Sequence, residues 1–215
     1  MRIWLLCASV LVLLLSGTAG YLIIDQYAPP PQLQGAYLQP ARKVESFQLV
    51  DHHQKAFTRD HLKGQWHLVT YGYTHCPDIC PMTLARLAGL VERLEREQVY
   101  PDLQVLFYSV DGERDTPEVL AQYTPHFNED FIGLTRSGSG RRGHRAFEQS
   151  LGILADVQSE EGWVNHGVML MLLNPEAQLQ AIFKPERNKH GLHHFTEEQL
   201  FRDYRAVRDY YSQRH

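Results

Sequence analysis

The sequence predicts an α/β domain with a central mixed sheet flanked by helices, preceded by one N-terminal transmembrane helix. Residues 3–24 contain no charged side chain, which sets them apart from the rest of the chain. Two apolar runs, residues 66–73 and 103–110, enclose a stretch with helical spacing. A second pair of apolar runs and a helical pattern close the chain. These features indicate a membrane segment followed by one domain in which strands and helices alternate.

The composition is that of an ordinary globular protein. The 215 residues are 43% apolar, 11% aromatic and 21% charged, with three cysteines and a formal net charge of −4. These values exclude the disordered, collagen-like and multi-span membrane classes. The chain beyond residue 24 is mildly acidic, which argues against nucleic acid as a partner.

Residues 1–25 are predicted to be a membrane anchor, with a cleaved signal peptide as the alternative. At about 1.5 Å per residue the uncharged run reaches roughly 33 Å, enough for a hydrocarbon core of about 30 Å. The small residues 16–20 suit signal cleavage, whereas renewed apolarity at residues 21–24 favours the anchor. Arg2 places the N-terminus in the cytoplasm. We expect a single-pass bacterial inner-membrane protein with its domain in the periplasm, because no Arg/Ser-rich transit sequence precedes the run.

Residues 26–42 are predicted to be a proline-rich linker, because this stretch shows neither a helical nor a strand period. A single folded domain is expected to span residues 43–215. At its entrance, the runs 47–50 and 55–58 flank a polar turn and predict a small hairpin.

The first half of the domain is predicted to contain a strand–helix–strand unit. Residues 66–73 are mostly apolar and rich in β-branched and aromatic side chains, as in a strand buried on both faces. Residues 82–98 carry leucines at helical spacing. Residues 103–110 form the second buried strand. A right-handed crossover between parallel strands is therefore expected.

The second half of the domain is predicted to add helices and a hairpin. Pro117 suits the first position of a helix, and residues 196–199 show a capping-box pattern. The order βαβα followed by ββα, with a cysteine pair at the first strand-to-helix junction, is the thioredoxin-like arrangement. The expected elements are helices over residues 116–127, 142–151 and 196–211, and strands over residues 166–173 and 178–184.

Cys76 and Cys80 stand at the mouth of the predicted helix. Residues four apart lie on the same side of a helix, so both sulfurs can approach one point. The helix N-terminus is expected to favour the thiolate, which binds metals and attacks disulfides. The alternatives are a plain stabilising disulfide or two buried thiols, although cross-linking so short a loop gains little entropy. Cys7 lies in the membrane run and is expected to have no role.

Two thiolates are too few for a structural zinc site, but two thiolates and one imidazole suit copper. Spacing alone leaves open which of the twelve histidines takes part. His166 begins a predicted buried strand, where a merely satisfied polar histidine is the alternative. His75 is nearer in sequence, but its position beside a cysteine points it away. His190, His193 and His194 are expected to lie on a solvated loop.

Three segments carry a resemblance to a known family. Residues 71–81, YGYTHCPDICP, resemble the signature of the Sco/SenC family of copper-binding, thioredoxin-like proteins that help assemble cytochrome c oxidase. Residues 109–117 and 131–135 resemble the second and third blocks of that family. Asn165 and His166, before an apolar run, match its metal-binding histidine.

The resemblance covers roughly residues 43–210 and implies a function. Cys76, Cys80 and His166 would bind one copper ion. The protein would be a membrane-tethered copper chaperone that delivers copper to the dinuclear copper centre of a cytochrome c oxidase subunit. Its other partner would be a thiol reductant or an upstream copper donor. The alternative is a thiol-disulfide oxidoreductase in which Cys76 and Cys80 reduce the copper-ligand cysteines of the oxidase.

The sequence departs from the family pattern at two positions. Many members have aspartate where this chain has Asn165, and proline where it has Gly112. Loss of that aspartate is expected to weaken the support of His166 and to alter copper affinity or redox potential, because groups around a ligand set its orientation. A peroxidase of the same fold would need a single peroxidatic cysteine in a threonine-containing loop, which the sequence does not show.

Overall fold

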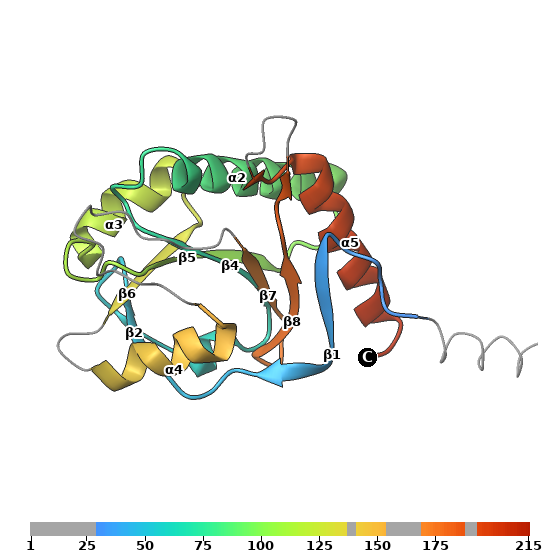
Figure 1. Ribbon diagram of the computed structural model, residues 1–215, viewed down its shortest axis with the longest axis horizontal. Coiled ribbons are helices and arrows are strands. Elements are labelled where there is room, and N and C mark those ends of the chain that lie inside the picture. The colour runs from blue at the N-terminus through green and yellow to red at the C-terminus, as the bar shows by residue number, and fades with distance from the viewer. Residues whose placement is uncertain (1–28, 137–140, 154–168, 188–192) are drawn as a thin grey trace, which may run out of the picture.

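The computed structural model describes residues 29–136, 141–153, 169–187 and 193–215 (Figure 1). The predicted membrane segment lies outside this part of the chain. None of the helices in the described ranges is both long enough and apolar enough to cross a membrane.

The described residues form an eight-stranded mixed sheet in the order β1-β8-β7-β4-β5-β6-β2-β3, and a two-stranded sheet of β9 and β10. β4, β5 and β6 are parallel, whereas their outer neighbours β7 and β2 are antiparallel to them. The strands are β1 (Gly35–Lys43), β2 (Gln48–Asp51), β3 (Ala56–Thr58), β4 (Trp66–Gly72), β5 (Leu103–Ser109), β6 (Ile132–Arg136), β7 (Leu170–Leu173), β8 (Gln178–Phe183), β9 (Glu186–Arg187) and β10 (His193–His194).

Helices cover both faces of this sheet. Figure 1 shows α2, α3 and α5 on one side and α4 on the other. The helices are α2 (Ile79–Glu97), α3 (Pro117–Tyr123), α4 (Arg141–Leu151) and α5 (Glu197–Ser212), with short 3-10 turns at Arg59–Leu62 and Thr124–His126. This arrangement confirms the predicted thioredoxin-like fold, its parallel crossover through α2 and its closing helix.

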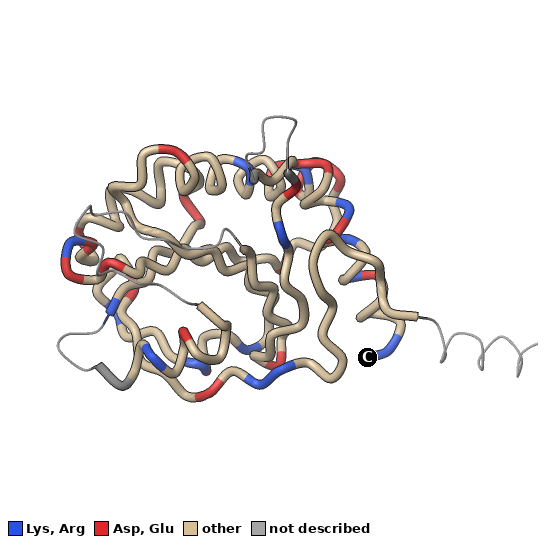
Figure 2. The backbone as a smooth tube through the Cα atoms, in the orientation of Figure 1, with Lys and Arg blue, Asp and Glu red and all other residues tan. Residues whose placement is uncertain are grey.

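β4 contributes to the cores on both faces. Trp66 and Leu68 pack in the cluster under α2 and α5, whereas Val69 and Tyr71 pack in the cluster under α4. All seven residues of β4 are buried, as the sequence predicts. Figure 2 shows acidic and basic residues on the helices, loops and outer strands, while β4 and β5 carry none.

Four strands differ from the sequence-based expectation. His193 and His194, expected on a solvated loop, form β10 and pair with β9. Residues 35–42, assigned to the linker, belong to β1, which pairs antiparallel with β8. Pro40 is compatible with this strand because β1 is at the edge of the sheet. Proline has no backbone N–H to donate, and an edge strand has no neighbour on one side that would need one. Residues 132–136, matched only as a family block, form β6 beside β5. Most other predicted elements are present within three residues of their expected ends, although the 116–127 helix is two pieces. The strand predicted over residues 166–173 is present as β7 from Leu170, and residues 166–168 lie outside the described residues.

Candidate metal centre

α2 begins earlier than the sequence predicts, and this places the cysteines. The N-cap is Asp78, so Cys80 and Pro81 occupy the second and third helical positions. The first four N–H groups of a helix have no acceptor within the helix, so proline is tolerated there. Cys80 therefore lies in the first turn of α2, and Cys76 lies in the loop that leads to it.

The sulfur of Cys80 fills a space that Gly72 leaves open. A Cβ atom at Gly72 would lie 2.4 Å from the Cys80 sulfur and 3.4 Å from the ring of Phe107. Cys80 is only 4% exposed, whereas Cys76 is half-buried. Solvent and ligands therefore reach the pair mainly through Cys76.

Cys76 and Cys80 are thiols that no disulfide joins, and their side chains hydrogen-bond to each other. This hydrogen bond raises the pKa of Cys80, burial raises it further, and a backbone hydrogen bond from Tyr73 opposes them in part. These effects oppose the thiolate expected for Cys80 at the helix N-terminus, because the contact with Cys76 and the loss of solvent outweigh the backbone hydrogen bond that favours the charged form.

The buried carboxylate of Asp115 ties the cysteine loop to the end of β5. It accepts hydrogen bonds from the backbone N–H of Thr74 at 2.9 Å, from the Thr74 hydroxyl at 2.6 Å and from the Ser109 hydroxyl at 2.6 Å. Asp115 is completely buried. Ser109 also accepts the N–H of Asp111 at 3.1 Å. This network fixes the backbone two residues before Cys76.

Tyr123, at the end of α3, completes the surroundings of the thiols. Its ring lies 5.4 Å from that of Phe107, measured between centroids. Its hydroxyl oxygen is buried and has no hydrogen-bond partner among the described residues. Burial raises the pKa of Tyr123, and electrostatic interaction with Cys80, Cys76 and Asp115 raises it further. The hydroxyl therefore lies within the electrostatic reach of both sulfurs.

The predicted histidines fall in different places. His166 and His190 lie outside the described residues, so their roles stay predictions. His75 is exposed, and its Nδ1 lies 3.2 Å from the hydroxyl of Thr74. His194 is half-buried in β10 and lines a small cavity with the first turn of α2.

The path of β7 bears on the predicted role of His166. Met171 of β7 pairs with Val69 of β4 in antiparallel register. β7 therefore begins at the edge of the sheet where β4 ends and the cysteine loop starts. Within the ranges that the structure describes, no group of three or more His, Cys, Asp and Glu side chains could hold a metal ion.

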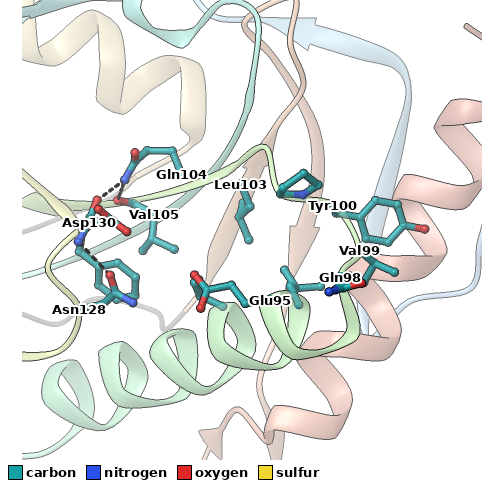
Figure 3. A pocket seen from close by; sticks show the side chains of 13 residues that line it. Glu95, Gln98, Val99, Tyr100, Leu103, Gln104, Val105, Asn128 and Asp130 are labelled. Carbon is teal, nitrogen blue, oxygen red and sulfur yellow. Dashed lines mark hydrogen bonds between the residues drawn. The ribbon is translucent and has the colours of Figure 1, made fainter.

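A cavity of about 480 Å³ lies at the other end of α2 (Figure 3). Leu94, Val105 and Phe131 line it together with the acidic residues Glu95 and Asp130. From Cys80 to Leu94 the helix rises about 21 Å at its usual rise per residue. This cavity is therefore separate from the thiol pair.

The fold and this site define a thioredoxin-like domain with a dithiol, Cys80 buried and Cys76 half-buried, at the junction of β4 and α2. The chain belongs to the SCO1/SenC family, whose model matches residues 35–200. It is 32% identical to a Stutzerimonas stutzeri protein named for copper binding, over 86% of this chain and 90% of that protein. It is 35% identical to the human mitochondrial SCO2 homolog over 66% of this chain. The match spans 53% of the human protein, about half its length.

Solved structures of this family have the same fold. ScoI of Arabidopsis thaliana, solved with copper bound, superposes with a TM-score of 0.64 at 28% identity, covering 77% of this chain and 98% of that one. ScoI of Bradyrhizobium japonicum, also with copper bound, gives a TM-score of 0.60 at 27% identity, covering 78% and 99%. These similarities confirm the family and fold that the cysteine block predicts.

Four residues of the site have no role in the sequence-based prediction: Gly72, Ser109, Asp115 and Tyr123. A glycine in a strand rich in β-branched residues often marks a place where another group approaches the backbone closely, so the sequence offers a signal for Gly72. Ser109 is the last residue of the parallel strand β5 and Asp115 follows it, and parallel strands end at the same edge of the sheet. Tyr123 carries no signal that separates it from an ordinary core aromatic residue.

Proposed function

We propose that this protein is a copper chaperone that binds one copper ion through Cys76, Cys80 and His166. It delivers this ion to the dinuclear copper centre of a cytochrome c oxidase subunit. The observation that carries the proposal is the pair of cysteines, in hydrogen-bond contact at the head of α2. Two sulfurs and one imidazole form a soft donor set that suits Cu(I) and accepts Cu(II). The copper-bound ScoI structures support it.

The protonation and exposure of the two thiols suit a site that takes up copper and releases it again. Because the pKa of Cys80 is raised, copper must displace a proton when it binds. Cys76 is half-buried, so a thiolate of a partner can reach copper from that side before the chaperone releases its own ligands. Exchange of ligands one at a time avoids free copper.

The N-terminal segment fits the same proposal. Residues 1–25 anchor the domain in the bacterial inner membrane, and the domain faces the periplasm. The short linker that follows keeps the domain close to the membrane. Tethering raises the effective concentration of the chaperone near a membrane-bound oxidase. An upstream copper donor or a thiol reductant supplies the domain.

A second candidate function is reduction of a disulfide in the oxidase. The cysteine pair favours it, because Cys76 and Cys80 can form a disulfide with each other while the target disulfide becomes two thiols. Cys76, the more exposed of the two, is the attacking thiol. This reaction needs no histidine.

Copper titration of the reduced full-length protein in detergent tests the proposal. We expect one copper per chain in the wild type and no stoichiometric binding in His166→Ala, which should still cycle its disulfide. Cys76→Ser should lose both activities. His75→Ala, an exposed histidine beside Cys76, is the matched control and should bind like the wild type. Full copper affinity in His166→Ala would refute the ligand assignment.

A further inference from the structure

The hydroxyl of Tyr123 is buried without a hydrogen-bond partner among the described residues. Buried hydroxyl groups are normally paired, because an unpaired one loses its bonds to water without replacement. A phenylalanine would fill the same space without this cost. The unpaired hydroxyl therefore points to a partner that becomes a strong acceptor only in another state of the site.

The surroundings of Tyr123 lead to the sulfurs. The Cys80 sulfur lies over Gly72, at a place where a glycine Cβ would also touch Phe107. The rings of Phe107 and Tyr123 pack with centroids 5.4 Å apart. Both sulfurs act electrostatically on the phenol. Tyr123, Phe107 and Cys80 are therefore neighbours on the same face of the sheet.

Asp115 also acts electrostatically on Tyr123, but it takes no hydrogen bond from the phenol. Its carboxylate accepts three hydrogen bonds, two from Thr74 and one from Ser109, which use three of about four acceptor positions. Of the groups that act on Tyr123 in the described part of the chain, the two cysteine sulfurs remain.

We propose that Tyr123 is a positioning residue whose hydroxyl donates a hydrogen bond to a cysteine sulfur when that sulfur becomes a thiolate bound to copper. The inference rests on the proposed copper site. A protonated thiol is a weak acceptor, whereas a thiolate accepts strongly, so the hydroxyl is paired only in the loaded state. Tyr123 therefore stabilises the loaded site relative to the empty one.

The variant Tyr123→Phe tests this role, because it removes the hydroxyl and keeps the ring. We expect Cu(I) affinity, measured by competition with a chelator, to fall about tenfold to hundredfold, as for loss of a hydrogen bond to a charged group. The sulfur-to-copper charge-transfer absorption of the Cu(II) form should move to longer wavelength. The hydrogen bond from Tyr123 lowers the energy of the sulfur electrons, and its loss makes their transfer to copper easier. The metal-free, reduced variant should unfold at an equal or higher urea concentration than the wild type.

Tyr108→Phe is the matched control, since the Tyr108 hydroxyl donates to Glu148 at 2.7 Å under α4 on the opposite face. It should unfold at a lower urea concentration and keep wild-type copper affinity and absorption. The ζ-carbon NMR resonance of Tyr123 in the wild type should also move when Cu(I) is added, which tests the proposal without a variant.

Wild-type copper affinity and absorption in Tyr123→Phe would overturn the role of Tyr123 and leave the copper site standing. An unmoved ζ-carbon resonance in copper-loaded wild type would overturn it too. A wild-type protein that binds no copper would refute the proposed function, and this inference with it.

Discussion

The polar groups at the two ends of β4 differ in whether they have interaction partners. At its beginning, the guanidinium of Arg208 lies 4.8 Å from the ring of Trp66 and donates to both carboxylate oxygens of Asp102, at 2.7 and 3.1 Å. At its end, the Cys80 sulfur fills the space over Gly72, and the Tyr123 hydroxyl has no partner among the described residues. We refer to these as the ion-pair end and the thiol end.

The difference separates groups that hold the fold from groups that wait for a ligand. A buried polar atom without a partner costs about 1 to 3 kcal/mol. At the ion-pair end, the charge of Arg208 is matched by Asp102 and by aromatic faces, so this end contributes to stability. At the thiol end, stability is lost in exchange for donors that can bind a soft metal. The predictions below test this division.

The largest effect is expected from Asp115→Ala at the thiol end. The change leaves two donors of Thr74 and one of Ser109 without their buried acceptor. We expect about 3 to 5 kcal/mol loss in the free energy of unfolding, and weaker copper binding because the cysteine loop is released. Urea denaturation of the reduced, metal-free protein measures the first, and chelator competition the second.

Asp115→Asn is the control, because its amide oxygen can still accept from Thr74. Its loss of stability should be smaller than that of Asp115→Ala. Equal urea midpoints for Asp115→Ala and the wild type would show that this carboxylate does not hold the loop.

His67 is an exception at the ion-pair end, and it is expected to have the next largest effect. Its Nδ1 is buried without a hydrogen-bond partner in the described part of the chain, and burial lowers its pKa from 6.5 to about 4. Above pH 6.5 the imidazole is neutral in both the folded and the unfolded states. Below it, only the unfolded state binds the proton, so stability falls as the pH drops, by roughly 3 kcal/mol at pH 4.

We would measure the free energy of unfolding of the wild type and of His67→Gln at several pH values between 7 and 4. The contribution of His67 is the difference between the two proteins in how steeply this free energy falls with pH. The difference also removes the background from His52, whose pKa burial lowers as well. The copper affinity of His67→Gln at pH 7 should equal that of the wild type. A large loss of copper affinity would mean that unpaired groups at both ends of β4 contribute to copper binding. It would contradict the claim that only the thiol end does so.

The sequence predicts the fold well because its signals are local and periodic. The fully buried β4 and the helical leucines of α2 show the crossover directly. β1 escapes prediction because Pro40 and the surrounding glycine and polar residues resemble a linker, and pairing with β8 provides its strand structure. Such long-range pairing leaves no local trace.

The candidate site is predictable only in its reactive atoms. Cys76 and Cys80 stand out by residue type and spacing, but the raised pKa of Cys80 depends on burial and on the contact between the two side chains. Asp115 contacts Thr74 across 41 positions of sequence, and no spacing pattern shows this. Tyr123 resembles any core aromatic residue until its hydroxyl is found without a partner.

Gly72→Ala is expected to have a moderate effect at the thiol end. The added methyl would lie 2.4 Å from the buried Cys80 sulfur, so the sulfur or the strand must shift. We expect about 1 to 3 kcal/mol loss of stability from overpacking, and at least a tenfold loss of copper affinity because the displaced sulfur is a ligand. Urea denaturation and chelator competition measure the two effects.

Gly89→Ala is the matched control within α2. Its added methyl would meet the side chain of Glu197, with the carboxylate oxygen nearest at 3.1 Å, and this flexible side chain can move. A helix interior favours alanine over glycine by about 0.5 to 1 kcal/mol, so this variant should be slightly more stable and bind copper normally. Normal copper affinity in Gly72→Ala would show that the Cys80 sulfur need not lie over Gly72.

Arg208→Lys at the ion-pair end is expected to have the smallest effect. Lysine keeps the charge, and its amine can replace the single nitrogen, Nη2, that donates to both oxygens of Asp102. It lacks the planar guanidinium group, so it stacks less well on Trp66 and Tyr100. We expect about 1 to 2 kcal/mol loss in the free energy of unfolding, because the Arg208 side chain is largely buried while Asp102 is partly exposed. Copper affinity should not change, since β4 separates this residue from the thiols by its full length. A variant that unfolds more easily and also binds copper more weakly would show that the two ends of β4 are coupled. The ion-pair end would then help to position the cysteines at the thiol end.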